Sequence, residues 1–187
     1  IVEEWFGKTI IHSDRRFTYE DAQTVLETGE GDHAAELKKI NVIAHKLRKD
    51  KFKNGAINFE SEEVVFKLDE NKKPVSIYVK ERKDAHLLIE DFMLLANKAV
   101  AKFVAKKAVP EIPFVYRIHD LPDDGKLADF AIFAKAMGFA MKLDSPKNIA
   151  ESFNSLAKAV EEDEKLKVLA PLAIRTMAKA EYNIKNI

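Results

Sequence analysis

The stretch RKDAHLLIEDFMLLANKAVAKFVA, residues 82–105, decides the fold of this chain. Apolar residues recur in it at helical spacing, which predicts the longest helix of the protein from residue 83 to about residue 107. The apolar positions are too many for one stripe, so we expect this helix to be buried on more than one side. Pro110 and Pro113 follow it and end it.

A polar stripe runs along the same helix. Its members, which fall within about 60° of one another at about 100° per residue, are His86, Glu90, Met93 and Asn97. Such a stripe is either a set of hydrogen-bonded contacts inside the protein or the wall of a polar channel. The spacing favours neither interpretation.

Strand patterns precede the long helix. Apolar and polar residues alternate over residues 64–68 and 75–79, which predicts a β-hairpin with its turn at 69–74. The run 56–59 is a candidate third strand beside this hairpin.

Helical patterns dominate after the long helix. Residues 114–119 form a strand-like segment, and helices are predicted over about 123–137, 146–160 and 162–180, the last with a kink at Pro171. Strands followed by helices indicate the α+β class. We therefore predict a small antiparallel sheet flanked by a long buried helix and a helical C-terminal part.

The N-terminal part begins with a β-branched and aromatic segment, residues 5–13, which predicts a strand. Thr18 and Asp21 resemble a capping box, so a short helix is expected from near Tyr19 until before Gly29. A further helical face follows, formed by Leu37, Ile40, Ala44 and Leu47.

This further helix is strongly basic. Seven basic residues against one acid give residues 38–53 a net charge of +6. Lys and Arg side chains at such density track nucleic-acid phosphates without sequence preference, but a solvated amphipathic face explains the pattern as well.

Composition bounds the class of protein. The 187 residues carry 31 basic and 31 acidic side chains, 47% hydrophobic residues and no cysteine. This content excludes wholesale disorder, a uniformly basic nucleic-acid binder, a disulfide scaffold and thiol catalysis, and it fits a reducing cytoplasm. No apolar run approaches the roughly 18 residues of a membrane span. Because the chain starts at Ile1 and stops abruptly at Ile187, we expect it to be a piece of a longer protein.

Residue types that bind metals or catalyse reactions occur without the spacing that would make a site. The five histidines are scattered, and His12 beside Ser13 lacks the strand-turn-helix geometry of a nucleophile elbow. Aspartates gather at residues 120–129, but Asp123 and Asp124 stand just before a helix, where they would cap its N-terminus. The sequence thus assigns no catalytic residue and no metal ligand.

Five segments together resemble the RNB catalytic domain of the ribonuclease R / ribonuclease II family of processive 3′→5′ exoribonucleases, closer to the bacterial ribonuclease R branch. They occur in the family's order and cover nearly the whole chain. The segments are IHSDRRFTY (11–19), NGAINFESEE (54–63), RKDAHLLIEDFMLLAN (82–97), YRIHDLP (116–122) and RTMAKAEY (175–182).

The resemblance implies an enzyme that threads single-stranded RNA into a channel and hydrolyses it to nucleoside monophosphates with magnesium. The family's magnesium-binding aspartates lie upstream of Ile1 and its transition-state arginine lies downstream of Ile187. Residues 1–187 are therefore expected to be a single partial RNB domain, inactive by itself and without bound Mg²⁺. The parent enzyme is expected to be cytoplasmic and monomeric, whereas exposed apolar surface would promote self-association of this piece.

The resemblance also suggests residues that contact RNA. Tyr19 matches the family's tyrosine that stacks on nucleotides at the 3′ end, and Arg15 and Arg16 supply neighbouring cations. The long helix matches the family helix beside the RNA channel. Its channel-wall candidates are Glu90, Met93 and Asn97.

Two points stay open. Asp91 stands where family members often have a second Glu, which keeps the charge but shortens the reach, and Arg117 and His119 match a Tyr-Arg-x-His segment without an assignable contact. The alternative function is a non-catalytic RNA-binding or scaffolding module that uses the basic helix at 38–53.

Overall fold

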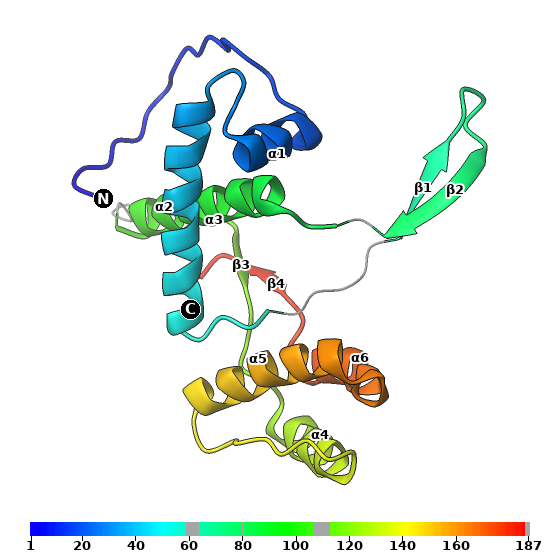
Figure 1. Ribbon diagram of the computed structural model, residues 1–187. Helices are drawn as coiled ribbons and strands as arrows, with labels where there is room; N and C mark the ends of the chain where they lie inside the picture. The colour runs from blue at the N-terminus through cyan, green and yellow to red at the C-terminus, as the bar shows by residue number, and fades with distance from the viewer. Residues whose placement is uncertain (59–63, 80, 107–112, 186–187) are drawn as a thin grey trace.

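The computed structural model describes residues 1–58, 64–79, 81–106 and 113–185 (Figure 1). Its elements in chain order are α1 (Tyr19–Thr28), α2 (Ala34–Lys53), β1 (Val64–Leu68), β2 (Pro74–Val79), α3 (Asp84–Lys106), β3 (Tyr116–Ile118), α4 (Asp124–Ala136), α5 (Pro146–Glu162), the 3₁₀ helix η1 (Glu164–Val168), α6 (Leu169–Thr176) and β4 (Glu181–Asn183). This content confirms the α+β class, with a small antiparallel sheet, a long helix and a helical C-terminal part.

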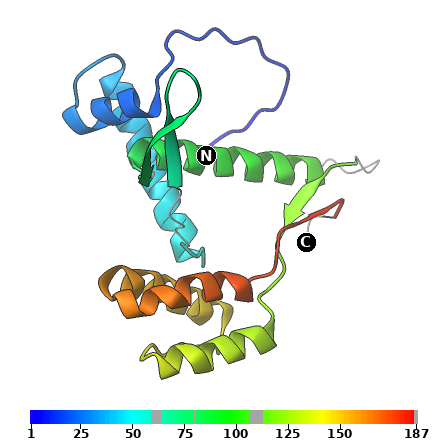
Figure 2. The same cartoon turned by 90° about the vertical axis from the view of Figure 1, so that its right-hand side faces the viewer.

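The helices form two groups, which both views separate (Figures 1 and 2). In the N-terminal helical group, α1, α2 and α3 pack against one another. In the C-terminal helical group, α4, α5, η1 and α6 do so. The β1–β2 hairpin projects to one side of both groups.

Helix α1 begins and ends where the sequence predicts. Thr18 is its N-cap, and the Thr18 Oγ1 accepts a hydrogen bond of 3.0 Å from the backbone N–H of Asp21. Gly29 is its C-cap with φ 74°, a left-handed conformation that glycine adopts without steric cost. The chain can therefore turn sharply into α2, which packs against α1.

Helix α3 has the predicted extent, but its burial is one-sided. Ala85, Leu88 and Asp91, all in its first half, are buried, and this half packs against α1 and α2. Met93 is 58% exposed and Val100 is also exposed. The helix is less buried than its apolar content predicts because, within the described residues, α1 and α2 cover it along one side only. Of the two prolines expected to end it, Pro110 lies outside the described residues.

The predicted strand at residues 5–13 is wrong, because this segment has no regular secondary structure. β-branched residues favour a strand only where a neighbouring strand pairs with the backbone, and the two sheets of the described residues each contain two strands paired with each other. The segment instead runs to α3, where the ring of Phe6 stacks on Phe103 with centroids 4.2 Å apart.

Strands β1 and β2 form the predicted antiparallel hairpin. Val64 lies opposite Val79 and Phe66 lies opposite Ile77, so these four side chains share one face of the hairpin. All four are exposed, by 49% to 66%. The hairpin therefore presents an exposed apolar face.

The candidate third strand at 56–59 is not a strand over residues 56–58, and Phe59 lies outside the described residues. Asn154 of α5 takes the place of a neighbouring strand. Its Nδ2 donates to the carbonyl oxygen of Ala56 at 2.9 Å, and its Oδ1 accepts from the N–H of Asn58 at 2.9 Å. This side chain links the C-terminal helical group to the segment that follows α2.

The C-terminal helical group encloses the main apolar core. Phe153, Leu156 and Leu169 are the largest fully buried side chains of the described residues. Phe153 of α5 stacks with Phe130 of α4 at 6.0 Å between ring centroids. Ser145 caps α5, and Pro146 occupies its first turn as the sequence predicts.

The single helix predicted at 162–180 is wrong in its extent. The segment consists of η1 and the short helix α6, and Pro171 stands in the first turn of α6, where its missing N–H breaks no helical hydrogen bond. Residues 181–183 form β4, which pairs with β3 through Ile118 opposite Glu181. Within the described residues, no helix combines the length and apolar content that crossing a membrane requires.

Candidate functional site

The ring of Tyr19 lies at the start of α1 and is 45% exposed. It stacks on the imidazole of His86, in the first turn of α3, with centroids 4.2 Å apart and planes inclined by 11°. The side-chain oxygen of Gln23 accepts a hydrogen bond of 3.0 Å from the backbone N–H of Ala85, which ties the two helix starts together. Tyr19 therefore presents a supported aromatic surface to solvent.

The two arginines predicted beside Tyr19 differ in their contacts. Arg15 pairs with Asp32 at 3.3 Å and lies over the ring of Phe17, 5.2 Å from its centroid. Arg16 is exposed. Both remain near Tyr19 in sequence, but Arg15 is already partly engaged by an acid.

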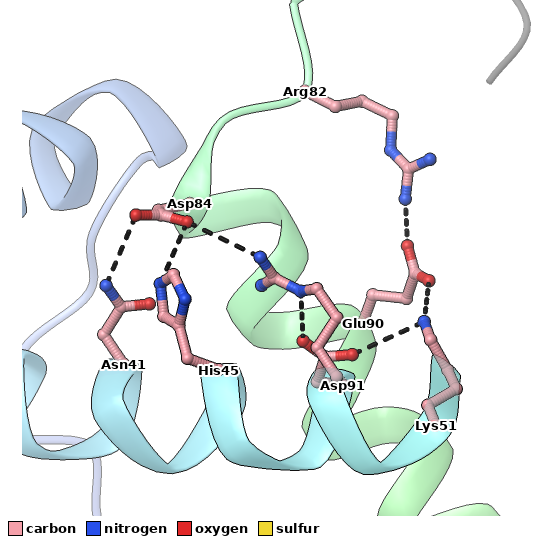
Figure 3. Close-up of polar contacts among 8 residues, drawn as sticks. Asn41, His45, Lys51, Arg82, Asp84, Glu90 and Asp91 are labelled. Carbon is pink, nitrogen blue, oxygen red and sulfur yellow. Dashed lines mark hydrogen bonds and ion pairs between the residues drawn. The ribbon is translucent and has the colours of Figure 1, made fainter. Parts of the chain in front are cut away.

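Glu90 points from α3 toward cations rather than into open solvent (Figure 3). Its carboxylate pairs with Lys51 of α2 at 3.3 Å and with Arg82, which precedes α3. The negative charge of Glu90 is thus compensated on two sides. This arrangement fits the hydrogen-bonded interpretation of the polar stripe at this position.

Asp91 is the buried anchor of the same network. Asp91 is 3% exposed. Its carboxylate accepts a hydrogen bond of 2.9 Å from Arg48 and lies 3.5 Å from the ammonium of Lys51. Charge-assisted bonds of this kind are directional and fix the relative position of two helices. The shorter side chain of Asp91 reaches the α2 cations directly.

Asp84 extends the network to the start of α3 (Figure 3). Its carboxylate lies 3.3 Å from His45 and 3.7 Å from Arg48, and it accepts a hydrogen bond of 3.5 Å from Asn41. Three carboxylates of α3 therefore face a row of polar and basic side chains on α2.

The polar stripe predicted on α3 is divided by the structure. His86 lies against Tyr19 and Glu90 pairs with cations, whereas Met93 and Asn97 are exposed on the less covered half of the helix. An RNA-contacting role for Glu90, Met93 and Asn97 stays a prediction.

The basic residues of α2 fall into two sets. Arg48 and Lys51 face the acids of α3. Lys38, Lys46 and Lys49 instead line a shallow groove of about 440 Å³. The other residues that line this groove are Leu26, Asn41, Val42 and His45. These lining residues include no acid, so this part of the helix offers positive charge to a ligand.

Of the two aspartates predicted at this helix start, Asp123 is the N-cap of α4 and Asp124 is the first residue of its first turn. The Oδ1 of Asp123 accepts a hydrogen bond of 2.9 Å from the N–H of Lys126 at the start of α4. No group of three or more metal-binding side chains occurs in the part of the chain that the structure describes. The carboxylates present there do not fit a magnesium site. Arg117 and His119 are both exposed.

Sequence reasoning missed two features of this region. It did not pair Tyr19 with His86, and it did not predict that Arg48 and Lys51 would meet Asp91. The second could have been suspected, because Arg48 and Lys51 stand three residues apart on one face of α2. The first required the packing of α1 on α3, which no local pattern encodes.

Comparisons with known proteins agree on one family. The RNB domain family matches residues 1–187. A DIS3-like exonuclease 2 of Schizosaccharomyces pombe is 33% identical over 97% of this chain, and a Ribonuclease R of Ureaplasma parvum is 35% identical over 77% of it. The chain spans about a fifth (21%) of the length of each.

A solved structure has the same fold. Mycoplasma genitalium RNase R in complex with ribose-methylated single-stranded RNA superposes with a TM-score of 0.78 at 22% sequence identity. The superposition covers 92% of this chain and 27% of the RNase R chain.

Proposed function

Because the chain belongs to the RNB domain family, we propose that it is part of a 3′→5′ exoribonuclease that hydrolyses single-stranded RNA to nucleoside monophosphates. The relatives in the comparisons include an exonuclease and a ribonuclease, and this chain spans 21% of the length of each. Residues 1–187 are proposed to be a single partial catalytic domain, so the activity belongs to the longer protein.

The observation that carries the proposal is the exposed ring of Tyr19, held by the cap of α1 and by His86. Base–aromatic stacking contributes about 1–3 kcal/mol per base and tolerates every base, as a processive enzyme requires. Arg15 and Arg16 stand beside it in sequence and supply positive charge for the adjoining phosphate. Tyr19 is proposed to hold the 3′-terminal nucleotide in register for hydrolysis.

Helix α3 is proposed to line the path of the RNA beyond Tyr19, with Met93 and Asn97 exposed along it. A bare carboxylate there would repel phosphates. Lys51 and Arg82 compensate the charge of Glu90, which reduces that repulsion while leaving carboxylate oxygens as hydrogen-bond acceptors.

Magnesium is proposed as the cofactor of the longer protein. When bound, it would generate the attacking hydroxide and stabilise the leaving oxygen. The contribution proposed for this chain is to bind and orient the RNA.

The test uses the protein encoded by the complete reading frame and, beside it, the 187-residue chain. With 5′-labelled single-stranded RNA and magnesium, the complete protein is expected to give products that shorten stepwise from the 3′ end. The 187-residue chain is expected to give none. Shortening by the chain alone would contradict a partial domain, and an inert complete protein would contradict the exoribonuclease.

Tyr19→Ala in the complete protein is expected to lengthen the final limit product while hydrolysis continues, because the terminal base loses its stacking surface. The size of the limit product on a sequencing gel is the measurement. Tyr182→Ala is the matched control, because Tyr182 is a 76% exposed tyrosine of β4 in the C-terminal half of the chain. An unchanged product ladder would remove Tyr19 from this role.

The groove on α2 supports a second candidate, a non-catalytic RNA-binding module. Lys38, Lys46 and Lys49 line this groove without an acid among the lining residues. Binding through them alone would weaken steeply with salt. Charge reversal of Lys46 and Lys49 should then abolish RNA binding by the 187-residue chain at low salt, whereas reversal of Lys147 and Lys158 on α5 should not. Undetectable binding by the unaltered chain would exclude this function.

A further inference from the structure

We propose that His86 is a positioning residue that holds the ring of Tyr19 in the orientation that stacks on the terminal RNA base. The inference rests on the proposed function, because it assigns His86 a role in the same nucleotide contact. It goes beyond the sequence analysis, which placed His86 in the polar stripe of the long helix but assigned it no role in RNA binding.

The geometry of the two rings carries the inference. With centroids 4.2 Å apart and planes inclined by 11°, the imidazole covers one face of the phenol ring. Tyr19 is nevertheless 45% exposed. The proposed base stacks on the face of the ring opposite His86, and the resulting order is base, Tyr19, His86.

Both rings stand on backbone that is fixed. Tyr19 directly follows the N-cap Thr18, and His86 lies in the first turn of α3, where its own N–H donates to the carbonyl oxygen of Lys83 at 3.0 Å. The Gln23–Ala85 hydrogen bond holds the two turns together. The relative position of the two backbones is thus fixed by this hydrogen bond and by the packing of α1 on α3, and the stack restrains the remaining rotation of the Tyr19 side chain.

The half-buried imidazole of His86 contains one polar atom that contributes nothing to the stack. Its Nδ1 is buried and has no hydrogen-bond partner among the described residues. An apolar ring at this position would cover Tyr19 without leaving a polar atom unsatisfied. Replacement by Phe should therefore preserve the stack, which gives the role of the ring face a direct test.

The effect expected from this role is moderate. Loss of the supporting ring should weaken RNA binding by about two- to twelve-fold, the range of aromatic pair interactions. Loss of Tyr19 itself should weaken it by about five-fold or more. Because His86 acts through Tyr19, the double variant should bind no worse than Tyr19→Ala alone.

The experiment measures the affinity of the protein encoded by the complete reading frame for a short fluorescein-labelled oligouridylate, by anisotropy with a chelator present. The variants are Tyr19→Ala, His86→Ala, His86→Phe and the double variant Tyr19→Ala/His86→Ala. His12→Ala serves as control, because the His12 side chain is 91% exposed. Proton NMR of the Tyr19 ring in the 187-residue chain and in its His86→Ala and His86→Phe variants shows whether the ring loses its neighbour in the first variant and keeps one in the second.

The inference predicts weaker binding by His86→Ala, recovery by His86→Phe and no additional loss in the double variant. Additive losses, or a failure of His86→Phe to recover affinity, would overturn it. If Tyr19→Ala weakens binding while His86→Ala does not, only the role of His86 falls. If Tyr19→Ala binds like the unaltered protein, the role of Tyr19 in the proposed function falls first and the inference falls with it.

Discussion

The two helical groups differ in their buried polar contacts, although both bury apolar side chains such as Leu88 in the N-terminal group. In the C-terminal group, α4, α5 and α6 meet through fully buried apolar side chains such as Phe153 and Leu169. In the N-terminal group, α2 and α3 meet across Asp91, a 3% exposed carboxylate that pairs with Arg48 and Lys51.

This difference suggests that the apolar core of the C-terminal group mainly stabilises the fold, whereas the ion pairs of the N-terminal group mainly fix the positions of side chains. Apolar burial is non-directional and accounts for most of the free energy of folding. Buried ion pairs give little net stability but require definite geometry. Two of the residues proposed to meet RNA, Tyr19 and Glu90, belong to the N-terminal group, where the polar contacts Gln23–Ala85 and Lys51–Glu90 join the helices.

The largest effect is expected from Phe153→Ala, which tests whether the C-terminal group depends on its apolar core. Truncating this fully buried ring removes its contacts with Phe130 and leaves a cavity, so the free energy of unfolding should fall by about 3–5 kcal/mol. Urea denaturation of the 187-residue chain gives the value. Amide exchange should show the loss first in α5.

Ile132→Ala is the matched control for that experiment, because Ile132 is an apolar residue of α4 that is 70% exposed. Its effect should stay within about 0.5 kcal/mol. A loss below about 1 kcal/mol for Phe153→Ala would mean that the C-terminal group does not depend on its core.

Asp91→Ala tests the other group. It leaves Arg48, whose side chain is 18% exposed, without its closest acid, so the free energy of unfolding should fall by about 2–3 kcal/mol. The double change Arg48→Met/Asp91→Leu should recover most of that loss, because an apolar pair leaves no uncompensated charge. Urea denaturation again supplies the measurement.

Glu151→Gln is the control for Asp91→Ala, since it breaks the exposed pair of Glu151 with Lys147. Its effect should not exceed about 0.5 kcal/mol. Equal losses from both variants would show that burial does not distinguish the N-terminal network from a surface ion pair.

Much of the fold followed from local patterns. Thr18 and Gly29 predicted both ends of α1, and the alternation over 64–68 and 75–79 predicted the hairpin. These signals are encoded within a few residues of the element that they define. They succeed because caps and turns satisfy nearby backbone groups.

The errors arose where distant residues decide the structure. Residues 5–13 have strand-forming side chains but no strand beside them, and Ala56 and Asn58 pair with Asn154, about 100 residues away, instead of with a strand. The same limit applied to the candidate site. Tyr19 was predicted as an RNA contact, but its partner His86 emerged only when α1 was packed on α3.

The smallest expected effect concerns an exposed carboxyl of the C-terminal group. The side chain of Asn148 donates a hydrogen bond of 2.7 Å to Asp144 and is the main cause that lowers the pKa of Asp144 below 3.8, with smaller contributions from its own backbone and from Lys142. A carboxyl whose pKa is lowered by folding stabilises the folded state above its unfolded pKa, and this contribution disappears as the pH falls through the folded value.

Asn148→Ala should therefore raise the pKa of Asp144 toward its ordinary value, which a carboxyl carbon-13 NMR titration measures directly. Lys142→Met should raise it less, because the charge of Lys142 is the smallest of the causes. Neither change should alter the urea midpoint at neutral pH as much as Asp91→Ala does, because Asp144 is fully exposed to solvent. A comparable midpoint shift would mean that surface polar contacts, and not only the apolar core around Phe153, hold the C-terminal group together.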